Sequence, residues 1–261
     1  MISSTSDRQR VRIFGIEVDV VTMPDTVAIL ESWVRSSASP CRYVVTPNVD
    51  HTIMYQHNPR LRDAYQAASL VLADGMPVLL ASRLLNKPLP QRVAGSDLVP
   101  ALFDATSTDR PLRVFLLGAG PGVADRAAAK IQRRWPAVQV VGTNCPPLGF
   151  ETDRGQNAAI VAAVNAARPD CLVVGLGAPK QELWVHRHYQ ELDVPVALCV
   201  GATIDFLAGE KQRAPRWMQR NGLEWLYRCA TEPRRLAGRY ARDAMIFPQL
   251  LWREWRRTGT A

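Results

Sequence analysis

Apolar, β-branched runs alternate with amphipathic stretches along residues 112–200, and this alternation limits the possible folds more than any other feature of the chain. Runs such as LRVFLLG, DCLVVGLG and VPVALCVG have the length and composition of buried strands, whereas the stretches between them have helical spacing. Helical crossovers let successive strands pair in parallel and cover both faces of the sheet. The pattern predicts a Rossmann-like α/β fold with a mostly parallel sheet flanked by helices.

The first part of the chain predicts further elements of the same kind. Residues 11–21 indicate two short strands broken at Gly15, and Thr22 and Asp25 are typical of a helix start. The elements expected next are a strand at 42–46, a helical region at 50–68 interrupted at Pro59, a strand at 69–73, a helix at 76–85 and a helix opened by Ser96 or Asp97.

Polar residues follow two of these strands, which predicts a binding crevice. Thr46 and Asn48 come after the first strand, Asp74 and Gly75 come after the second, and Arg92 lies in the next loop. The carboxyl ends of parallel strands open into the space between flanking helices, where ligands bind in α/β proteins. We therefore group Thr46, Asn48, Asp74 and Arg92 as one candidate site.

Asp74 is the sharpest catalytic candidate in this group. Partial burial at the strand end raises the pKa of a carboxyl group and suits it to act as a general base. The sequence has no Asp-x-Asp pair that would hold a divalent metal on a diphosphate. Arginines and helix amides would then have to meet the charge of such a leaving group.

Three glycine-containing turns follow later strands. In Gly118-Ala-Gly120-Pro-Gly122 the third glycine is misplaced for a dinucleotide fingerprint, so a phosphate-binding turn or a purely structural turn fits better than nicotinamide binding. In the second turn Gln181 can offer donors to phosphate or sugar oxygens. In the third, Asp205 either binds sugar or ribose hydroxyls or caps a helix, and position alone does not decide between the two.

The net charge of +8 lies entirely in residues 211–261, which hold 12 Lys and Arg against four acids and four of the seven tryptophans. Basic residues mixed with Trp and Leu are typical of a helix in the headgroup region of an anionic membrane. A solvated helical face around core tryptophans is the alternative, and nucleic-acid binding is less favoured because no recognition motif accompanies the charge. We expect an α/β catalytic domain at 1–210 and a helical appendage at 211–261.

The N-terminal residues lack the apolar core of a signal peptide, and no run reaches the length of a spanning helix. The five cysteines are scattered and include no CxxC pair, which favours reduced, buried thiols. We expect a cytoplasmic protein that is not integral to the membrane.

Several blocks resemble the WecG/TagA/CpsF family of bacterial glycosyltransferases, which extend polyprenyl-diphosphate-linked sugars during surface polysaccharide assembly. The blocks occur in the family's order along most of the chain: VVTPNVD, LADGMPV, QRVAGSDL, VFLLGAGPGVA, VVGLGAPKQE, GATIDFLAGEKQRAPRW, GLEWLYR and EPRRLAGRY. The resemblance implies an inverting enzyme without metal or other cofactor that uses a UDP-sugar donor and a polyprenyl-diphosphate-linked monosaccharide acceptor. It also implies a peripheral position on the inner face of the cell membrane.

The resemblance assigns roles to individual residues. Asp74 is similar to the family's proposed base, Thr46 and Asn48 to substrate-positioning residues, and Asp205 to a nucleotide contact. Arg92 and Gln181 are similar to contacts with donor or acceptor. The C-terminal segment is expected to close over the site and dock on the membrane, with arginines that reach the diphosphate. Arg228 and Arg235 match these arginines best, and Arg239 is a further candidate. Family members often have two arginines just before the tyrosine, whereas this chain has Gly238-Arg239-Tyr240, so which arginine acts there stays open.

Two other classes of function stay open at this point. One is a non-catalytic protein that binds nucleotides or nucleic acid through the basic tail, and the other is a nicotinamide-dependent oxidoreductase acting on sugar nucleotides. The sequence leaves the identities of the donor and acceptor sugars open, and it leaves homo-oligomerisation open as well.

Overall fold

The computed structural model describes residues 8–36, 40–215, 217–218 and 222–258. Its main sheet has six strands in the order β4-β3-β8-β7-β5-β6, and every neighbouring pair is parallel. The strands are β3 (Arg42–Val45), β4 (Leu70–Val71), β5 (Leu112–Gly118), β6 (Val138–Asn144), β7 (Cys171–Gly175) and β8 (Val196–Cys199). The predicted α/β fold is confirmed.

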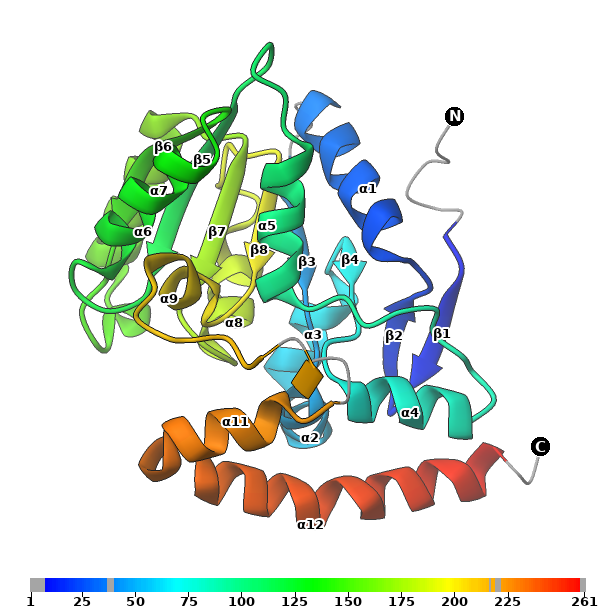
Figure 1. Cartoon of the computed structure of the whole chain (residues 1–261). Helices are drawn as coiled ribbons and strands as arrows, with labels where there is room; N and C mark the ends of the chain where they lie inside the picture. Colours follow the sequence, from blue (N-terminus) through cyan, green and yellow to red (C-terminus); the bar gives the residue numbers. More distant parts are fainter. Residues whose placement is uncertain (1–7, 37–39, 216, 219–221, 259–261) are drawn as a thin grey trace.

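Helices cover both faces of this sheet (Figure 1). Side chains alternate along each strand, so Val44 of β3 belongs to one buried cluster while Tyr43 and Val45 belong to the other. The first cluster includes residues of α1 (Met23–Ser36), α5 (Gly95–Ala105), α6 (Val123–Arg134) and α9 (Thr203–Ala208). The second includes residues of α2 (Val49–His57), α3 (Pro59–Gln66), α4 (Met76–Leu84), the 3₁₀ turn η1 (Phe150–Thr152), α7 (Arg154–Ala167) and α8 (Lys180–His188).

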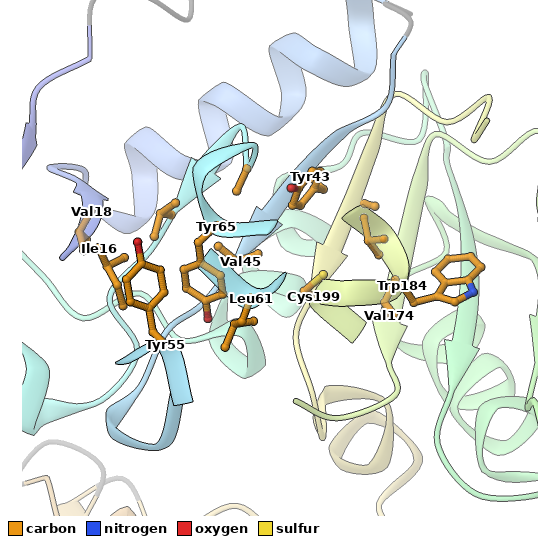
Figure 2. Close-up of a cluster of buried hydrophobic side chains, with 14 of the residues drawn as sticks. Ile16, Val18, Tyr43, Val45, Tyr55, Leu61, Tyr65, Val174, Trp184 and Cys199 are labelled. Carbon is orange, nitrogen blue, oxygen red and sulfur yellow. The ribbon is translucent and has the colours of Figure 1, made fainter. Parts of the chain in front are cut away.

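Aromatic residues fill the second cluster between α2, α3 and the sheet, as Figure 2 shows. Tyr55 and Tyr65 meet edge to face with ring centroids 5.7 Å apart, and Val45 and Cys199 are fully buried in the same cluster. This packing fixes α2, whose first residues directly follow Thr46 and Asn48. The core therefore determines where the polar residues after β3 lie.

An antiparallel hairpin, β1 (Arg10–Ile13) and β2 (Ile16–Asp19), forms a separate two-stranded sheet. Its turn has positive φ at Phe14 and Gly15, 52° and 82°, which confirms the predicted break at Gly15. The buried carboxylate of Asp19 accepts a hydrogen bond of 2.8 Å from the Val71 amide. The hairpin is thus tied to β4, three residues before Asp74.

The C-terminal part contains α11 (Glu224–Thr231) and the long α12 (Pro233–Thr258), which runs past α2 and α4 in Figure 1. Arg239 and Arg242 of α12 both pair with Asp50 of α2, and Leu236 and Phe247 are buried. The predicted helical character of this region is confirmed. Its division from residues 1–210 as a separate domain stays a prediction.

The start of α5 differs from the prediction. The helix begins at Gly95 with Ala94 as its N-cap residue, and neither Ser96 nor Asp97 caps it. The Asp97 carboxylate instead binds Arg92 and Arg213. A Cβ at Gly95 would lie 2.7 Å from Val200 Cγ1, so a glycine is needed where α5 packs on the end of β8.

Candidate active site

Three segments of the chain meet at Asp74. The Asp74 amide donates a 2.9 Å hydrogen bond to the Pro47 carbonyl, and the Val93 amide donates a 2.9 Å bond to the Ala73 carbonyl. Gly75, with φ of 104°, leaves room beside Asn48, whose Cβ would lie 3.9 Å from a Cβ at position 75. The structure therefore brings together the segments that carry Thr46, Asn48, Asp74 and Arg92.

Arg92 lies among three carboxylates. Its Nη2 donates a 2.6 Å hydrogen bond to Asp97 Oδ2. Its Nη1 lies 3.5 Å from Glu224 Oε2 and 3.7 Å from Asp74 Oδ1. Arg213 braces the same acids, because its Nη2 is 2.8 Å from Asp97 Oδ1 and its Nε is 3.9 Å from Glu224 Oε1. Residues of α5, α11 and three loops thus form one ionic cluster around Arg92.

The Asp74 carboxyl titrates near neutral pH within this cluster. Burial is the largest cause and, with the negative charges of Glu224 and Asp97, raises its pKa to about 7, whereas Arg92 and Arg228 oppose the rise. About a quarter of the side chain, 26%, stays exposed. A carboxyl group with a pKa near the working pH, open to a ligand, suits general base catalysis.

Thr46 and Asn48 hold the loop after β3 in place. Thr46 Oγ1 donates a 3.2 Å hydrogen bond to the Cys199 carbonyl at the end of β8. Asn48 is the N-cap of α2, and its Oδ1 accepts a 3.2 Å bond from the His51 amide. Their contacts with a substrate stay predictions, and Asn48 lies beside Gly75, the residue that follows Asp74.

Gln181 is buried, with 1% of its surface exposed. Its Oε1 accepts a 3.0 Å hydrogen bond from the Gly201 amide, and its Nε2 donates a 2.7 Å bond to the fully buried Glu182. Both ends of the amide are therefore bonded inside the protein and hold the turn after β8. A contact with donor or acceptor stays a prediction.

Asp205 lies in the first turn of α9, where Ala202 and not Asp205 is the N-cap residue. Its Oδ2 is 4.0 Å from Lys211 Nζ. The guanidinium groups of Arg213 and Arg228 lie 5.5 Å and 5.7 Å from the ring centroid of the next residue, Phe206. Cations therefore gather where β8 ends, as an anionic ligand requires.

The three tail arginines proposed for the diphosphate occupy different surroundings. Arg228 lies close enough to Asp74 for its charge to lower the pKa of that carboxyl. Arg235 pairs with Glu232 at 2.6 Å. Arg239 pairs with Asp50 at 3.6 Å and lies over the ring of Tyr240. In this structure only Arg228 of the three is placed beside the Asp74 cluster.

Three members of the cluster, Asp97, Arg213 and Glu224, were absent from the site predicted by sequence. Asp97 is of a residue type typical of helix starts. Arg213 and Glu224 belong to the charged residues of the tail at 211–261. All three fall within blocks that resemble the family, namely QRVAGSDL, GEKQRAPRW and GLEWLYR. Membership of these blocks could have pointed to the three residues, but it does not indicate that the blocks meet in space.

The last residues of β5 and β7, Gly118 and Gly175, have a packing role. A Cβ at Gly118, where φ is 113°, would lie 2.6 Å from the Gly175 backbone, and one at Gly175 would lie 2.8 Å from the Gly201 carbonyl oxygen. Side chains at these positions would push the three strand ends apart. Close packing of the strand ends therefore explains the need for a glycine at position 118, and no bound phosphate is required to explain it.

Within the described ranges, no group of three or more His, Cys, Asp or Glu is arranged to hold a metal ion. The five cysteines are free, and Cys41, Cys171 and Cys199 are buried. Among the residues whose structure is described, no helix is long and apolar enough to cross a membrane.

A parallel α/β sheet with arginines and a carboxyl group of raised pKa beyond the carboxyl-terminal ends of its strands is typical of enzymes that act on anionic ligands. The particular family follows from comparison: the model of the glycosyl transferase WecG/TagA/CpsF family matches residues 11–261. The chain belongs to this family and is a glycosyltransferase.

Two relatives carry the same name, N-acetylglucosaminyldiphosphoundecaprenol N-acetyl-β-D-mannosaminyltransferase. The protein of Bacillus spizizenii is 33% identical over 193 residues, which are 74% of this chain and 72% of the relative. The protein of Staphylococcus aureus is 27% identical over 239 residues, 90% of each chain. The classes of nicotinamide oxidoreductase and non-catalytic binding protein are therefore replaced by that of a glycosyltransferase.

Proposed function

We propose that this enzyme transfers a hexose or N-acetylhexosamine-type sugar from a UDP-sugar to a polyprenyl-diphosphate-linked monosaccharide. The names of the relatives support the acceptor, because both act on an N-acetylglucosaminyl-diphosphoundecaprenol. The same names support N-acetylmannosamine as the first donor sugar to test. The product would enter the assembly of a surface polysaccharide.

The observation that carries the proposal is the Asp74 carboxyl group, which lies partly exposed beyond the ends of β3 and β4 and has its pKa raised to about 7. Asp74 would accept the proton of an acceptor hydroxyl, the C4 hydroxyl by family resemblance, as that oxygen attacks the anomeric carbon of the donor. The bond from this carbon to the UDP oxygen breaks on the opposite side, so the configuration inverts. Such a base contributes about 10²- to 10⁴-fold to the rate.

Positive charge for the departing UDP would come from the residues around Phe206. Lys211, Arg213 and Arg228 lie there beside Asp205, which we assign to the nucleotide. One guanidinium group can bind two phosphate oxygens through two parallel hydrogen bonds, and this binding needs no metal ion. Of the three tail arginines, Arg228 lies by Phe206 and close enough to Asp74 to lower its pKa, so we assign Arg228 first to the diphosphate.

We further propose that residues 211–261 dock the enzyme on the membrane, whereas residues 1–210 form the catalytic domain. The exposed apolar residues support this role: Trp217, Trp225, Leu226, Met245, Trp252 and Trp255 are all about half exposed or more. Basic residues accompany them, as an anionic lipid surface requires. A lipid acceptor held in a bilayer needs an enzyme that works at its surface, on the cytoplasmic side where nucleotide sugars are made.

A screen of UDP-sugars against short-chain lipid-diphosphate acceptors tests the proposal. The donors are UDP-N-acetylmannosamine, its uronic acid and UDP-glucose, and the acceptors carry N-acetylglucosamine or glucose. Mass spectrometry and NMR identify the product and its linkage. We expect transfer by the wild type and by the matched variant Asp63→Asn on the exposed side of α3, and a loss of about 10²-fold or more for Asp74→Asn. Near-normal transfer by Asp74→Asn would remove the assigned base.

A further inference from the structure

Glu224, the first residue of α11, shares one nitrogen atom with the proposed base. Arg92 Nη1 lies 3.5 Å from Glu224 Oε2 and 3.7 Å from Asp74 Oδ1, while Arg92 Nη2 is hydrogen-bonded to Asp97. Neither Nη1 contact is as short as the Asp97 bond of 2.6 Å. Arg92 is therefore bound most closely by Asp97, and its Nη1 is shared between Glu224 and Asp74 without a close pair to either.

Sharing of this kind matters for a base. A carboxylate in a close pair with an arginine has its pKa lowered by about 1–3 units and is then a weak proton acceptor at neutral pH. With Glu224 in place, part of the positive field of Arg92 is neutralised and a negative charge is added near Asp74. Both effects favour the protonated form of Asp74 and strengthen the base.

The C-terminal segment brings Glu224 to this position from far along the chain. A Cβ at Gly222, where φ is 72°, would lie 2.8 Å from Met76 Cβ, so the backbone before α11 rests directly on the residue that opens α4. Arg213 braces Glu224 from the other side, with its Nε 3.9 Å from Glu224 Oε1. The contact of Gly222 with Met76 and the ion pair with Arg213 thus hold Glu224 beside Arg92.

We propose that Glu224 is a positioning residue that keeps Arg92 from pairing closely with Asp74, so that Asp74 stays active as a base. This inference rests on the proposed function of Asp74. Without the Glu224 carboxylate, Arg92 Nη1 would be free to turn toward Asp74 and hold it as an unreactive carboxylate.

The charged groups around Asp74 come from each element packed against it. Arg92 lies in the loop before α5, Asp97 lies in α5, and Glu224 and Arg228 lie in α11. Arg213 acts through its contacts with Asp97 and Glu224. The two acids oppose the two nearest arginines, and Glu224 is the acid that the C-terminal segment supplies.

The experiment follows the titration of Asp74 by carbon-13 NMR of labelled carboxyl groups in the full chain, with the signal assigned by its loss in Asp74→Asn. We expect the midpoint in Glu224→Gln to fall by about one unit from that of the wild type. The matched variant Glu210→Gln removes an exposed acid that pairs with Arg126 at 2.8 Å, and it should leave the midpoint unchanged. An unchanged or higher midpoint in Glu224→Gln overturns the proposal.

A second variant covers the case in which Glu224→Gln does not fold. Glu224→Asp keeps the charge and should keep the Asp74 midpoint within a few tenths of a unit of the wild type, and a full one-unit fall in this variant also overturns the proposal. The acid limb of kcat/KM for transfer should move with the NMR midpoint. A midpoint shift without any measurable transfer contradicts the proposed function and leaves the coupling of Glu224 to Asp74 standing.

Discussion

Phe247 of α12 packs on Phe14 in the turn of the β1–β2 hairpin, with ring centroids 5.3 Å apart. The two residues are 233 positions apart in the sequence, and both are buried. The contact fixes the middle of α12 to a hairpin that Asp19 in turn ties to β4. The C-terminal helix is therefore attached to the body of the enzyme by contacts that include the Phe14–Phe247 pair and the Asp50 ion pairs.

We predict that Phe247→Ala loosens α12 more than it unfolds the sheet. Removal of a buried phenylalanine costs about 3–5 kcal/mol, and here the loss falls on the contact between α12 and the hairpin. Limited proteolysis should cut the variant within residues 233–258 faster than the wild type, whereas the core fragment should persist. Met245→Ala, which changes a 65% exposed residue of the same helix, is the control and should be cut at the wild-type rate. Equal cutting of all three proteins would contradict the contact.

Alanine substitution should cost much more stability at Asp19 than at Glu17, although both residues lie in β2. Asp19 is buried, accepts from Arg10 Nε at 3.0 Å and from the Val71 amide at 2.8 Å, so Asp19→Ala should lower the free energy of unfolding by about 3–5 kcal/mol. Glu17 is half exposed and 3.8 Å from Arg12, so Glu17→Ala should cost no more than about 1 kcal/mol. Urea unfolding measures both, and a cost for Glu17→Ala equal to that of Asp19→Ala would contradict this account.

Local chemistry was enough to predict most elements of the fold. The break at Gly15, the interruption at Pro59 and the strand from Leu112 follow from backbone geometry and from runs of apolar residues. The start of α5 did not, because Asp97 has the composition of a cap residue but is drawn into an ionic cluster with Arg92 and Arg213. Long-range ion pairs leave no periodic signal in one sequence.

The candidate site was predictable in part for the same reason. Asp74 and Arg92 follow strand ends, and the topology of a parallel sheet brings strand ends together. Glu224 follows no strand and is 150 residues from Asp74, so its place beside Arg92 depends on how the C-terminal segment folds back. The burial of Gln181 was likewise hidden, because a glutamine at the first turn of a helix is exposed in most proteins.

The raised pKa of Asp74 predicts a stability cost that depends on pH. Its pKa of about 7 in the folded enzyme exceeds the ordinary value of 3.8, so the folded state binds more protons than the unfolded state between these values. Stability should therefore fall as pH rises from about 4 to 7 through this group. At pH 8 the free energy of unfolding, measured with urea, should be higher for Asp74→Asn than for the wild type by at most about 4 kcal/mol. This difference should shrink as the pH approaches 4. A constant difference across this range would mean that Asp74 titrates normally.

The outer residues of α12 predict its behaviour at a lipid surface. Met245 and Trp252 are two helical turns apart, and Trp255 follows Trp252 after nearly one more turn, so the three residues lie on one side of the helix. Each has more than half of its surface exposed. The Arg256 guanidinium lies 4.8 Å from the Trp252 ring centroid, which joins a positive charge to the apolar face. Trp252→Ser with Trp255→Ser should weaken binding to vesicles that contain phosphatidylglycerol by about tenfold or more, because interfacial tryptophans and basic residues both contribute to such binding. Leu148→Ser, which removes a 97% exposed leucine from the loop before η1, should bind as the wild type does in the same sedimentation assay. Equal binding by the double variant and the wild type would remove α12 from the docking surface.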